Sequence, residues 1–504
     1  MSGLDPIALQ VLVGALRSIC DEMGAVLIRS SHSPNIKERR DCSTALFTPT
    51  GELVMQAEHI PVHLGSMPDA VAAVLEFDQR PDRAWILNDP YRGGTHLPDI
   101  TLITPVFDQG ALLGFAACRA HHADVGGPTA GGMPSDSRAL DEEGVVISPC
   151  EATDDRLREL AGMMRAPGQR LADLRAQLAA NALGARRLAE LATDSAGTLG
   201  AGMAEILDYA ERRTRAALAA MADGSWERTD LLEGGPGGAA DIELRVRATI
   251  SGDALELDFT GSAAQVDGNL NCPITVTRAA SFFAVRVLTD PDAPPSAGSH
   301  RPVRVIAPEG SLLNARSPAA VAAGNVETSS RVADLVLGAL GEPAGGPAQG
   351  QGTMNNLTLA NERFTYYETI GGGQGACANG DGPSAVHVAM SNTLNTPVEA
   401  LETELPLRVR ELSVRRDSGG AGRHRGGDGI VREIEALEPM RFTLITERRR
   451  HPPRGRDGGA DGLPGRNLVN GEEIASKASG ELRAGDRLRI ETPGGGGHGG
   501  SEQA

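Results

Sequence analysis

A block of helical pattern, residues 152–222, separates two strand-rich parts of this chain. Apolar residues recur there at helical spacing in LADLRAQLAANALGARRLAELA and MAEILDYAERRTRAALAAMA, and no proline follows Pro167 within the block. Such periodicity indicates amphipathic helices. Because 504 residues exceed what one compact core usually holds, we expect several domains. The pattern predicts a multi-domain α+β protein with mixed sheets: an N-terminal α/β region at 1–150, an inserted helical segment at 151–225 and a C-terminal α+β region at 226–504.

Short apolar runs bounded by turn residues predict strands on both sides of this block. Hairpins are predicted for TALFTPTGELVMQ near the N-terminus and for DIELRVRATISGDALELDFTG after the helical block. Three more strands are predicted for AWIL, DITLITPVF and ALLGFAACRA. Helices are predicted for TRAASFFAVRVLTD and for the opening segment, where Asp5 is a candidate N-cap and Pro6 the first helical residue. Strands and helices are thus interleaved along the chain.

Glycine and proline are unusually frequent. The 63 glycines and 31 prolines make up roughly a fifth of the chain, against a usual share of about 12%. Because no collagen-like period is present, this excess indicates tight turns and long shaped loops, where functional sites often lie. Glycine-rich loops are predicted for 341–385 and 417–429. The final stretch, ETPGGGGHGGSEQA, is too glycine-rich to pack on its own.

The formal net charge of −18 argues against nucleic acid and anionic lipid as partners, because both carry charge of the same sign. The six cysteines are scattered and form no CxxC pair, which favours reduced thiols in a cytosolic protein. The N-terminal segment contains acidic residues and has no basic stretch before an apolar run. It therefore predicts neither a signal peptide nor a membrane span, and we expect a cytoplasmic protein.

The strongest chemical signal is a group of Asp and His residues that follow the predicted strands. Six potential ligands lie in this stretch: Asp89, His96, Asp99, His121, His122 and Asp124. Strand ends place side chains at a rim where several loops can converge. Imidazole nitrogen combined with carboxylate oxygen suits manganese, iron(II) or zinc. The group predicts a metal site, with inert, hydrogen-bonded loop residues as the alternative interpretation.

Three further residues are weaker candidates. Asp41, in KERRDCS, is typical of a charge-paired structural residue, but it could complete a metal site if its loop folds inward. His59 and His63 have the i, i+4 spacing of a helical metal pair, but Pro61 between them argues against a helix. We interpret both histidines as substrate-facing or structural.

Several common catalytic motifs are missing. The chain has no Walker or GxGxxG motif, so nucleotide binding by this chain itself is not predicted. It also has no GxSxG motif and no identifiable catalytic cysteine, so nucleophilic catalysis by the protein is not predicted either.

Ten long segments, spread over nearly the whole chain, carry a family resemblance. They are SPNIKERRDCSTALF, EHIPVHLGSMP, NDPYRGGTHLPDITLITPVF, RAHHADVGG, GNLNCPITVTRAA, GNVETSSRVADLVLGAL, GTMNNLTLA, YYETIGGGQGA, SNTLNTPVEALE and GGAGRHRGGDG. In order and spacing they resemble the hydantoinase B/oxoprolinase family, which includes N-methylhydantoinase B-type subunits and is related to acetone and acetophenone carboxylase subunits. One departure lies in the tail, where His498 stands in the place of the aromatic residue common in the family.

The resemblance implies a subunit of an ATP-dependent enzyme that opens cyclic amides such as hydantoins, 5-oxoproline or lactams. It implies a hetero-oligomer in which ATP-Mg is held by a hydantoinase A-type subunit, in agreement with the missing Walker motif. It also implies a divalent metal (Zn, Mn or Fe) in this chain. The positions that match the family's metal site are Asp41, Asp89, His96, His121 and Asp124, with His122 the weakest ligand candidate.

These implications lead to a mechanistic hypothesis. A metal-activated water, with Asp124 and His121 as the catalytic residues, would attack an intermediate phosphorylated by the partner. Asn355, Asn356, Glu368 and the glycines at 371–373 would line the substrate path, or else only form turns and strand ends. Two alternatives remain: a subunit of an ATP-dependent, biotin-independent ketone carboxylase, and a non-catalytic scaffold for the ATP-binding partner.

Overall fold

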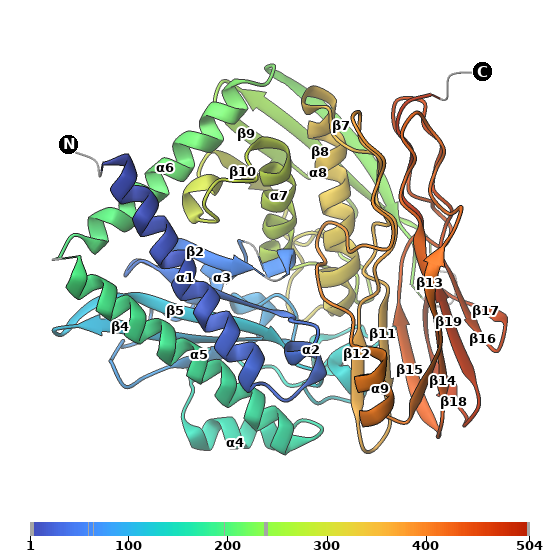
Figure 1. Ribbon diagram of the computed structural model, residues 1–504, viewed down its shortest axis with the longest axis horizontal. Coiled ribbons are helices and arrows are strands. Elements are labelled where there is room, and N and C mark those ends of the chain that lie inside the picture. The colour runs from blue at the N-terminus through green and yellow to red at the C-terminus, as the bar shows by residue number, and fades with distance from the viewer. Residues whose placement is uncertain (1–4, 59, 64, 196, 236–239, 501–504) are drawn as a thin grey trace.

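An antiparallel sheet organises the N-terminal part of the computed structural model, which describes residues 5–58, 60–63, 65–195, 197–235 and 240–500 (Figure 1). Its strand order is β2-β1-β5-β4-β3-β6. The strands are β1 (Cys42–Phe47), β2 (Leu53–Glu58), β3 (Trp85–Leu87), β4 (Asp99–Asp108), β5 (Ala111–His121) and β6 (Cys150–Glu151). All five strands expected from the apolar runs of this region are confirmed, and β6 adds a short edge.

Helices from two distant parts of the sequence cover one face of this sheet. They are α1 (Pro6–Ser30) and α5 (Pro167–Asp194), which pack against each other and against the strands. α4 (Asp154–Gly162) packs on α5, and α6 (Leu199–Ala219) contacts α1 and, at one end of the sheet, β2. The predicted helical block is thus confirmed, and it lies on the N-terminal sheet instead of standing apart from it. α1 begins at Pro6 as expected, but the Asp5 side chain makes no capping hydrogen bond.

Shorter elements connect or flank the strands of this part of the chain. They are α2 (Pro34–Lys37), α3 (Met67–Ala72) and the 3₁₀ turns η1 (Pro61–His63), η2 (Pro90–Arg92), η3 (Ala130–Gly132), η4 (Leu140–Glu142) and η5 (Ala297–His300). A small core forms there from side chains such as Phe47, Met67, Trp85 and Phe115. None of the helices among the described residues is long and apolar enough to span a bilayer.

A second sheet, with strand order β10-β9-β8-β7, lies against two long helices. The strands are β7 (Gly224–Leu232), β8 (Ile242–Ser251), β9 (Ala254–Asp258) and β10 (Val303–Ile306), and the helices are α7 (Ile274–Thr289) and α8 (Ser329–Ala344). Alternate residues of β8 face inward, and Leu244, Val246 and Ala248 are fully buried. Directly before α8 the chain makes a π-helical turn, η6 (Gly324–Thr328), in which every residue is buried.

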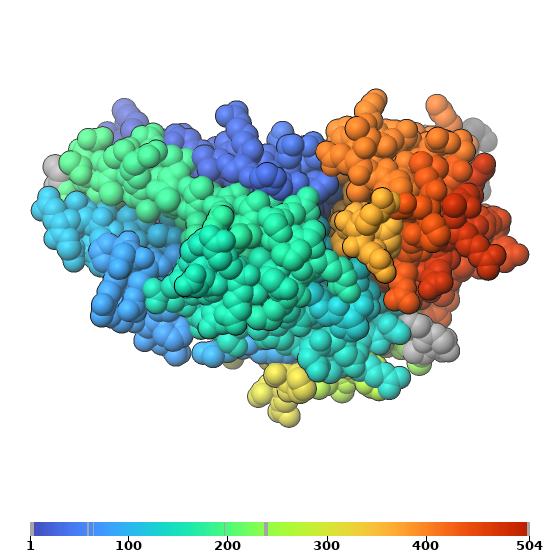
Figure 2. All heavy atoms as spheres, turned by 90° about the horizontal axis from the view of Figure 1, so that it is seen from below, coloured from blue at the N-terminus to red at the C-terminus, as the bar shows by residue number. Residues whose placement is uncertain are grey.

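Two further sheets form the C-terminal part, which Figure 2 shows as a lobe beside the N-terminal helices. The first has the order β12-β11-β15-β18 and the second β13-β14-β19-β16-β17. Their elements are β11 (Asn356–Ala360), β12 (Thr365–Glu368), α9 (Val398–Glu404), β13 (Leu407–Arg415), β14 (Gly429–Ala436), β15 (Met440–Ile445), β16 (Arg466–Val469), β17 (Glu472–Ile474), β18 (Lys477–Leu482) and β19 (Arg487–Glu491). Inward side chains of both sheets share one apolar core.

The glycine-rich stretches lie largely in loops, as we expected, and these loops run extended and pack closely side by side in what we call the glycine lattice. Backbone hydrogen bonds run from Gly427 N to Gln374 O, from Gly495 N to Gly427 O and from Gly497 N to Ala460 O. The chains lie so close that a Cβ added at Gly427 would stand 1.9 Å from the Pro383 carbonyl oxygen. The C-terminal stretch, which we expected to be too glycine-rich to pack on its own, therefore packs against other glycine-rich segments of the chain.

We predict that Gly427→Ala lowers the melting temperature, because a methyl group in this lattice must displace backbone at a cost of about 1–3 kcal/mol or more. Gly380→Ala is the matched control, since a Cβ there meets nothing within 4 Å. Thermal unfolding monitored by circular dichroism compares the two variants with the wild type. Equal melting temperatures for both variants would contradict the close packing.

Candidate metal centre

Strand register brings three of the chemical residues to one end of the N-terminal sheet. In the antiparallel pairing of β4 with β5, Asp99 lies directly opposite His121. On the other side of β5, strand β1 begins at Cys42, and the His121 backbone N–H donates to the Asp41 carbonyl at 3.0 Å. Because β1, β5 and β4 are neighbours, Asp41, His121 and Asp99 start from adjacent backbone positions.

The Asp99 carboxylate is the meeting point of two histidines. Its Oδ1 lies 3.3 Å from His63 Nε2, its Oδ2 lies 3.2 Å from His96 Nε2, and Thr95 donates its hydroxyl to Oδ2 at 2.7 Å. Burial acts to raise the pKa of Asp99, but His96 and His63 outweigh burial and hold this pKa well below its usual range. Asp99 is therefore an ionised carboxylate inside the protein.

His121 presents a nitrogen that has no partner. Asn35 Nδ2 lies 3.0 Å from its Nδ1 and also donates to its carbonyl oxygen at 2.8 Å. The Nε2 atom of His121 is buried and makes no hydrogen bond among the described residues. The same holds for both ring nitrogens of His96, because the contact of His96 with Asp99 lacks hydrogen-bond geometry. The two rings are 5.0 Å apart between centroids. Burial, followed by the nearby His96, lowers the pKa of His121 to about 3, so the ring is neutral.

Asp41 adds a second carboxyl group to the cluster. Burial raises its pKa to about 8, and the charge of Asp99 adds to this shift, whereas Arg39 and the Asn35 amide lower it. Two buried carboxyl groups thus lie beside the neutral ring of His121. This donor set, two oxygens and two nitrogens from Asp41, Asp99, His96 and His121, suits a divalent metal ion.

The side chains are not closed around a metal position as they stand. Among the described residues, no three His, Cys, Asp or Glu side chains are arranged so that they could hold an ion directly. The Asp99 carboxylate instead contacts His63 and His96 directly. A cation would have to take the place of the His96 contact, and the unpartnered nitrogens of His96 and His121 are the groups available for it.

Elements from the C-terminal half pack against this cluster. The Tyr367 ring stacks on His121 at 4.6 Å with an interplanar angle of 7°. The Tyr367 hydroxyl donates to Asn356 Oδ1 at 2.7 Å, and Asn356 Nδ2 donates to Glu327 Oε1 at 2.7 Å. From the same π-helical turn as Glu327, Asn325 Nδ2 lies 3.4 Å from Asp99 Oδ2. Turn η6 therefore reaches the cluster at two points.

The structure does not join Asp124 to this cluster, contrary to our expectation. Its Oδ1 accepts from the backbone N–H groups of Gly126 and Arg165, and its Oδ2 accepts from Gly131 N and the Arg165 guanidinium. Every bond of this carboxylate holds a glycine-rich loop. Because both oxygens are already occupied, Asp124 has the contacts of a structural residue and not those of a ligand or a base.

Asp89 and His122 also have other partners. Asp89 caps the short turn η2 by accepting from Tyr91 N at 3.0 Å, and it accepts a longer bond from the Ser148 hydroxyl. His122 Nε2 lies 2.9 Å from Gln177 Oε1 of α5. His59 lies outside the described residues, whereas His63, which we expected to be substrate-facing or structural, orients Asp99.

The three residues expected along the substrate path are buried and differ in their surroundings. Asn356 belongs to the chain of contacts that ends on His121, as described above. The Asn355 side chain donates a hydrogen bond to Gln351 Oε1 and accepts one from the Arg449 guanidinium. Glu368 accepts from Arg432 and from the Tyr366 hydroxyl, and it lies 3.9 Å from Arg39. Asn355 and Glu368 therefore have all the contacts of framework residues.

Asn35, Tyr367 and Glu327 are members of this site that sequence reasoning did not single out. Each lies inside a segment that carries the family resemblance, namely SPNIKERRDCSTALF, YYETIGGGQGA and GNVETSSRVADLVLGAL. Their positions in those segments give no indication that they approach a His/Asp cluster far away in sequence. Only the contacts across the sheets reveal it.

We predict that Glu327→Gln flattens the pH dependence of stability. Burial, and next the charge of Glu447, raises the pKa of Glu327 from its ordinary 4.5 to about 8. The folded protein thus holds this proton more tightly than the unfolded chain does. Stability from the group is fully present below the unfolded pKa and is lost as the pH rises through about 8.

Melting temperatures of the wild type and of Glu327→Gln at about pH 6 and about pH 9 test this prediction. The variant should gain relative to the wild type at the higher pH, because glutamine keeps the acceptor for Asn356 and carries no charge. Parallel curves would show that Glu327 does not hold a proton.

The chain is similar to proteins of one known family. A family model described as Hydantoinase B/oxoprolinase matches residues 5–501. The chain is 39% identical to 5-oxoprolinase 1 of Arabidopsis thaliana, over 98% of this chain and 42% of that protein. It thus spans about two fifths of the length of the 5-oxoprolinases that it matches.

A shorter relative and a solved structure match nearly end to end. The chain is 30% identical to the putative B subunit of a D-/L-hydantoinase of Pseudomonas, over 98% of this chain and 90% of that protein. The crystal structure of the ATP-dependent caprolactamase from Pseudomonas jessenii matches with a TM-score of 0.92 and 28% identity, over 99% of this chain and 92% of that one. The chain belongs to the hydantoinase B/oxoprolinase family.

Proposed function

We propose that this chain is the B-type part of an ATP-dependent hydrolase that opens cyclic amides. The names of its relatives support this: 5-oxoprolinase, D-/L-hydantoinase and ATP-dependent caprolactamase all refer to ring amides. The observation that carries the proposal within this chain is the buried cluster of Asp41, His96, Asp99 and His121. Its unpartnered imidazole nitrogens and paired carboxyl groups have the chemistry of a divalent metal site.

The reaction needs two kinds of activation. An amide is a poor electrophile and water is a poor nucleophile at neutral pH. Phosphorylation of the amide oxygen by an A-type partner carrying ATP-Mg would correct the first, because it makes the ring carbon more electrophilic. Water would add to this carbon, the C–N bond would break to leave an acyl phosphate and the ring nitrogen as an amine, and a second water would release phosphate. A divalent metal ion (Zn, Mn or Fe), when bound, supplies the second kind of activation by lowering the pKa of water towards neutrality.

The residues of this chain have distinct tasks in that scheme. Asp41, His96, Asp99 and His121 would hold the metal, and this set replaces Asp89 and Asp124 of our sequence-based prediction with Asp99. His63 and Thr95 orient the Asp99 carboxylate, and the stacked Tyr367 ring fixes the plane of His121. Such outer contacts orient the ligands and affect affinity about 10–100-fold when they are lost.

The A-type partner is part of the proposal. The putative B subunit of the Pseudomonas hydantoinase is a relative of similar length, which fits a separate ATP-binding chain and a hetero-oligomer. The 5-oxoprolinases are much longer than the matched region, which fits a fusion of the two parts. In both arrangements the ATP-binding part must lie near the metal centre so that the activated amide reaches it.

We predict that metal content distinguishes the two ligand sets. His121→Ala and Asp99→Asn should each lose bound metal, because both remove a donor from the cluster. Asp124→Asn should keep the metal and instead lower the melting temperature, because it weakens the bonds that hold the loop around Gly126 and Gly131. Elemental analysis by inductively coupled plasma mass spectrometry, with circular dichroism as the folding control, measures both effects.

Two results would count against the revised set. Full metal content in folded His121→Ala would remove His121 from it. Loss of metal in folded Asp124→Asn would restore the set expected from spacing.

Activity is tested with the chain and an A-type partner purified together. We expect ATP-dependent ring opening of at least one substrate among 5-oxoproline, hydantoin and caprolactam, and its loss in His121→Ala. A parallel assay with acetone and bicarbonate tests the ketone carboxylase alternative, and turnover only there would overturn the hydrolase proposal. Unchanged ring opening in His121→Ala would support the scaffold interpretation.

A further inference from the structure

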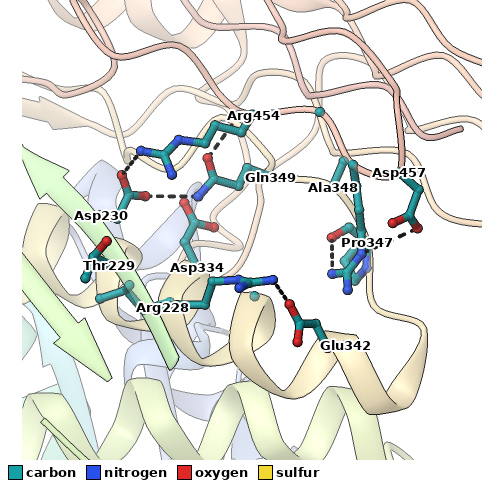
Figure 3. A pocket seen from close by; sticks show the side chains of 14 residues that line it. Arg228, Thr229, Asp230, Asp334, Glu342, Pro347, Ala348, Gln349, Arg454 and Asp457 are labelled. Carbon is teal, nitrogen blue, oxygen red and sulfur yellow. Dashed lines mark hydrogen bonds and ion pairs between the residues drawn. The ribbon is translucent and has the colours of Figure 1, made fainter. Parts of the chain in front are cut away.

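A cavity of about 300 Å³ lies away from the metal centre, between strand β7, helix α8 and the segments 347–349 and 454–457 (Figure 3). A second cavity, of about 230 Å³, shares with it the wall formed by Asp334, Gly338 and Pro347–Gln349. The second cavity is lined mainly by apolar side chains, among them Phe283, Val287, Leu337 and Val388. The first, more polar cavity thus adjoins the second, more apolar cavity, and the two share one wall.

Asp334 supplies a free acceptor at this wall. The residue is 5% exposed, and its Oδ2 accepts from Arg448 Nη2 at 2.8 Å. Its Oδ1 makes no hydrogen bond among the described residues, and the residue lines both cavities. Burial raises the pKa of Asp334 to about 7, although Arg331 acts to lower it. A ligand group that donates hydrogen bonds, above all an ammonium, would satisfy this carboxyl group.

Arg454 supplies free donors in the same chamber. Its backbone N–H donates to Gln349 Oε1, but within the described part of the chain its guanidinium makes only a loose ion pair, at 3.6 Å, with Asp230 Oδ1. Figure 3 shows the Arg454 and Asp334 side chains on either side of Gln349, whose amide is fixed by a bond to Asp230. A ligand carboxylate would find unused guanidinium donors there.

Other ligand classes fit this chamber less well. A metal ion is disfavoured because no three His, Cys, Asp or Glu side chains of the described residues are arranged to hold one. A nucleotide or other polyanion would meet four carboxylates in the lining, Asp230, Asp334, Glu342 and Asp457, against three arginines, Arg228, Arg454 and Arg456. A purely apolar ligand would bury Asp334 Oδ1 and the Arg454 guanidinium without partners, which is costly. A molecule with one ammonium and one carboxylate satisfies both groups.

We propose that this double cavity is a binding site for an amino acid with an apolar side chain. The ligand ammonium faces Asp334, its carboxylate faces Arg454, and its side chain lies between Phe283, Val287, Leu337 and Val388. The proposal stands on the cavity alone and does not depend on the proposed hydrolase activity, because it concerns binding by this chain without a partner or ATP.

Isothermal titration calorimetry on the full chain with L-leucine tests this site. We expect one site per chain in the millimolar range or tighter, and a loss of about tenfold or more in affinity in Arg454→Gln and in Asp334→Asn, because each removes a charged hydrogen bond. Arg441→Gln is the matched control, since Arg441 is an exposed arginine on β15 that forms an ion pair with Glu481. Arg454 has a half-exposed side chain, so its variant should fold even if Asp334→Asn is destabilised.

Three probes separate the classes of ligand. 4-Methylpentanoate lacks the ammonium of leucine and 3-methylbutylamine lacks its carboxylate, so both should bind at least about tenfold more weakly than leucine. Adenosine monophosphate represents the nucleotide class and should not compete. No heat from L-leucine, equal affinity for the half-molecules, unchanged binding in Arg454→Gln, or binding of the nucleotide alone would each overturn the proposal.

Discussion

The Asp99 carboxylate is the group around which the buried Asp/His cluster is arranged. It is buried, ionised and shared between His63 and His96, and it lies opposite His121 across the β4–β5 ladder. An ionised carboxylate at such depth is tolerated only where positive or hydrogen-bonding partners surround it. The cluster provides these partners from η1, from the loop before β4 and from η6. Removing the Asp99 carboxylate would leave His63, His96 and Thr95 without this shared contact.

Residues of the C-terminal half also contact this cluster. Tyr367 stacks on His121, and its hydroxyl is held through Asn356 by Glu327, a buried carboxyl group in the π-helical turn before α8. Single π-helical turns of this kind are often found at functional sites. The chain is thus one functional unit although it contains separate sheets, because residues before 125 and after 320 meet at the same cluster. The glycine lattice holds the C-terminal segments together at distances that only glycine permits.

Asp99 and Asp124 have the same spacing to a histidine but different surroundings in the structure. Both follow a histidine in an HxxD arrangement, His96 with Asp99 and His121 with Asp124, so the sequence treats them alike. In the structure, Asp99 starts a strand whose neighbour ends at His121, which points it into the cluster. Asp124 lies beyond the strand end, where glycines turn the chain and backbone N–H groups occupy its oxygens. Register, which depends on pairing between distant segments, made this distinction.

The sequence by itself determined the main elements and the family, because apolar period, turn residues and residue types act locally. It predicted the strands, the helical block and an Asp/His metal site that includes Asp41, His96 and His121. Only the tertiary structure decided that Asp99 joins them, that Tyr367 and Glu327 support them, and that the glycine-rich stretches pack as a lattice. Those features arise from contacts between segments far apart in the chain, and no local pattern records which segments will meet.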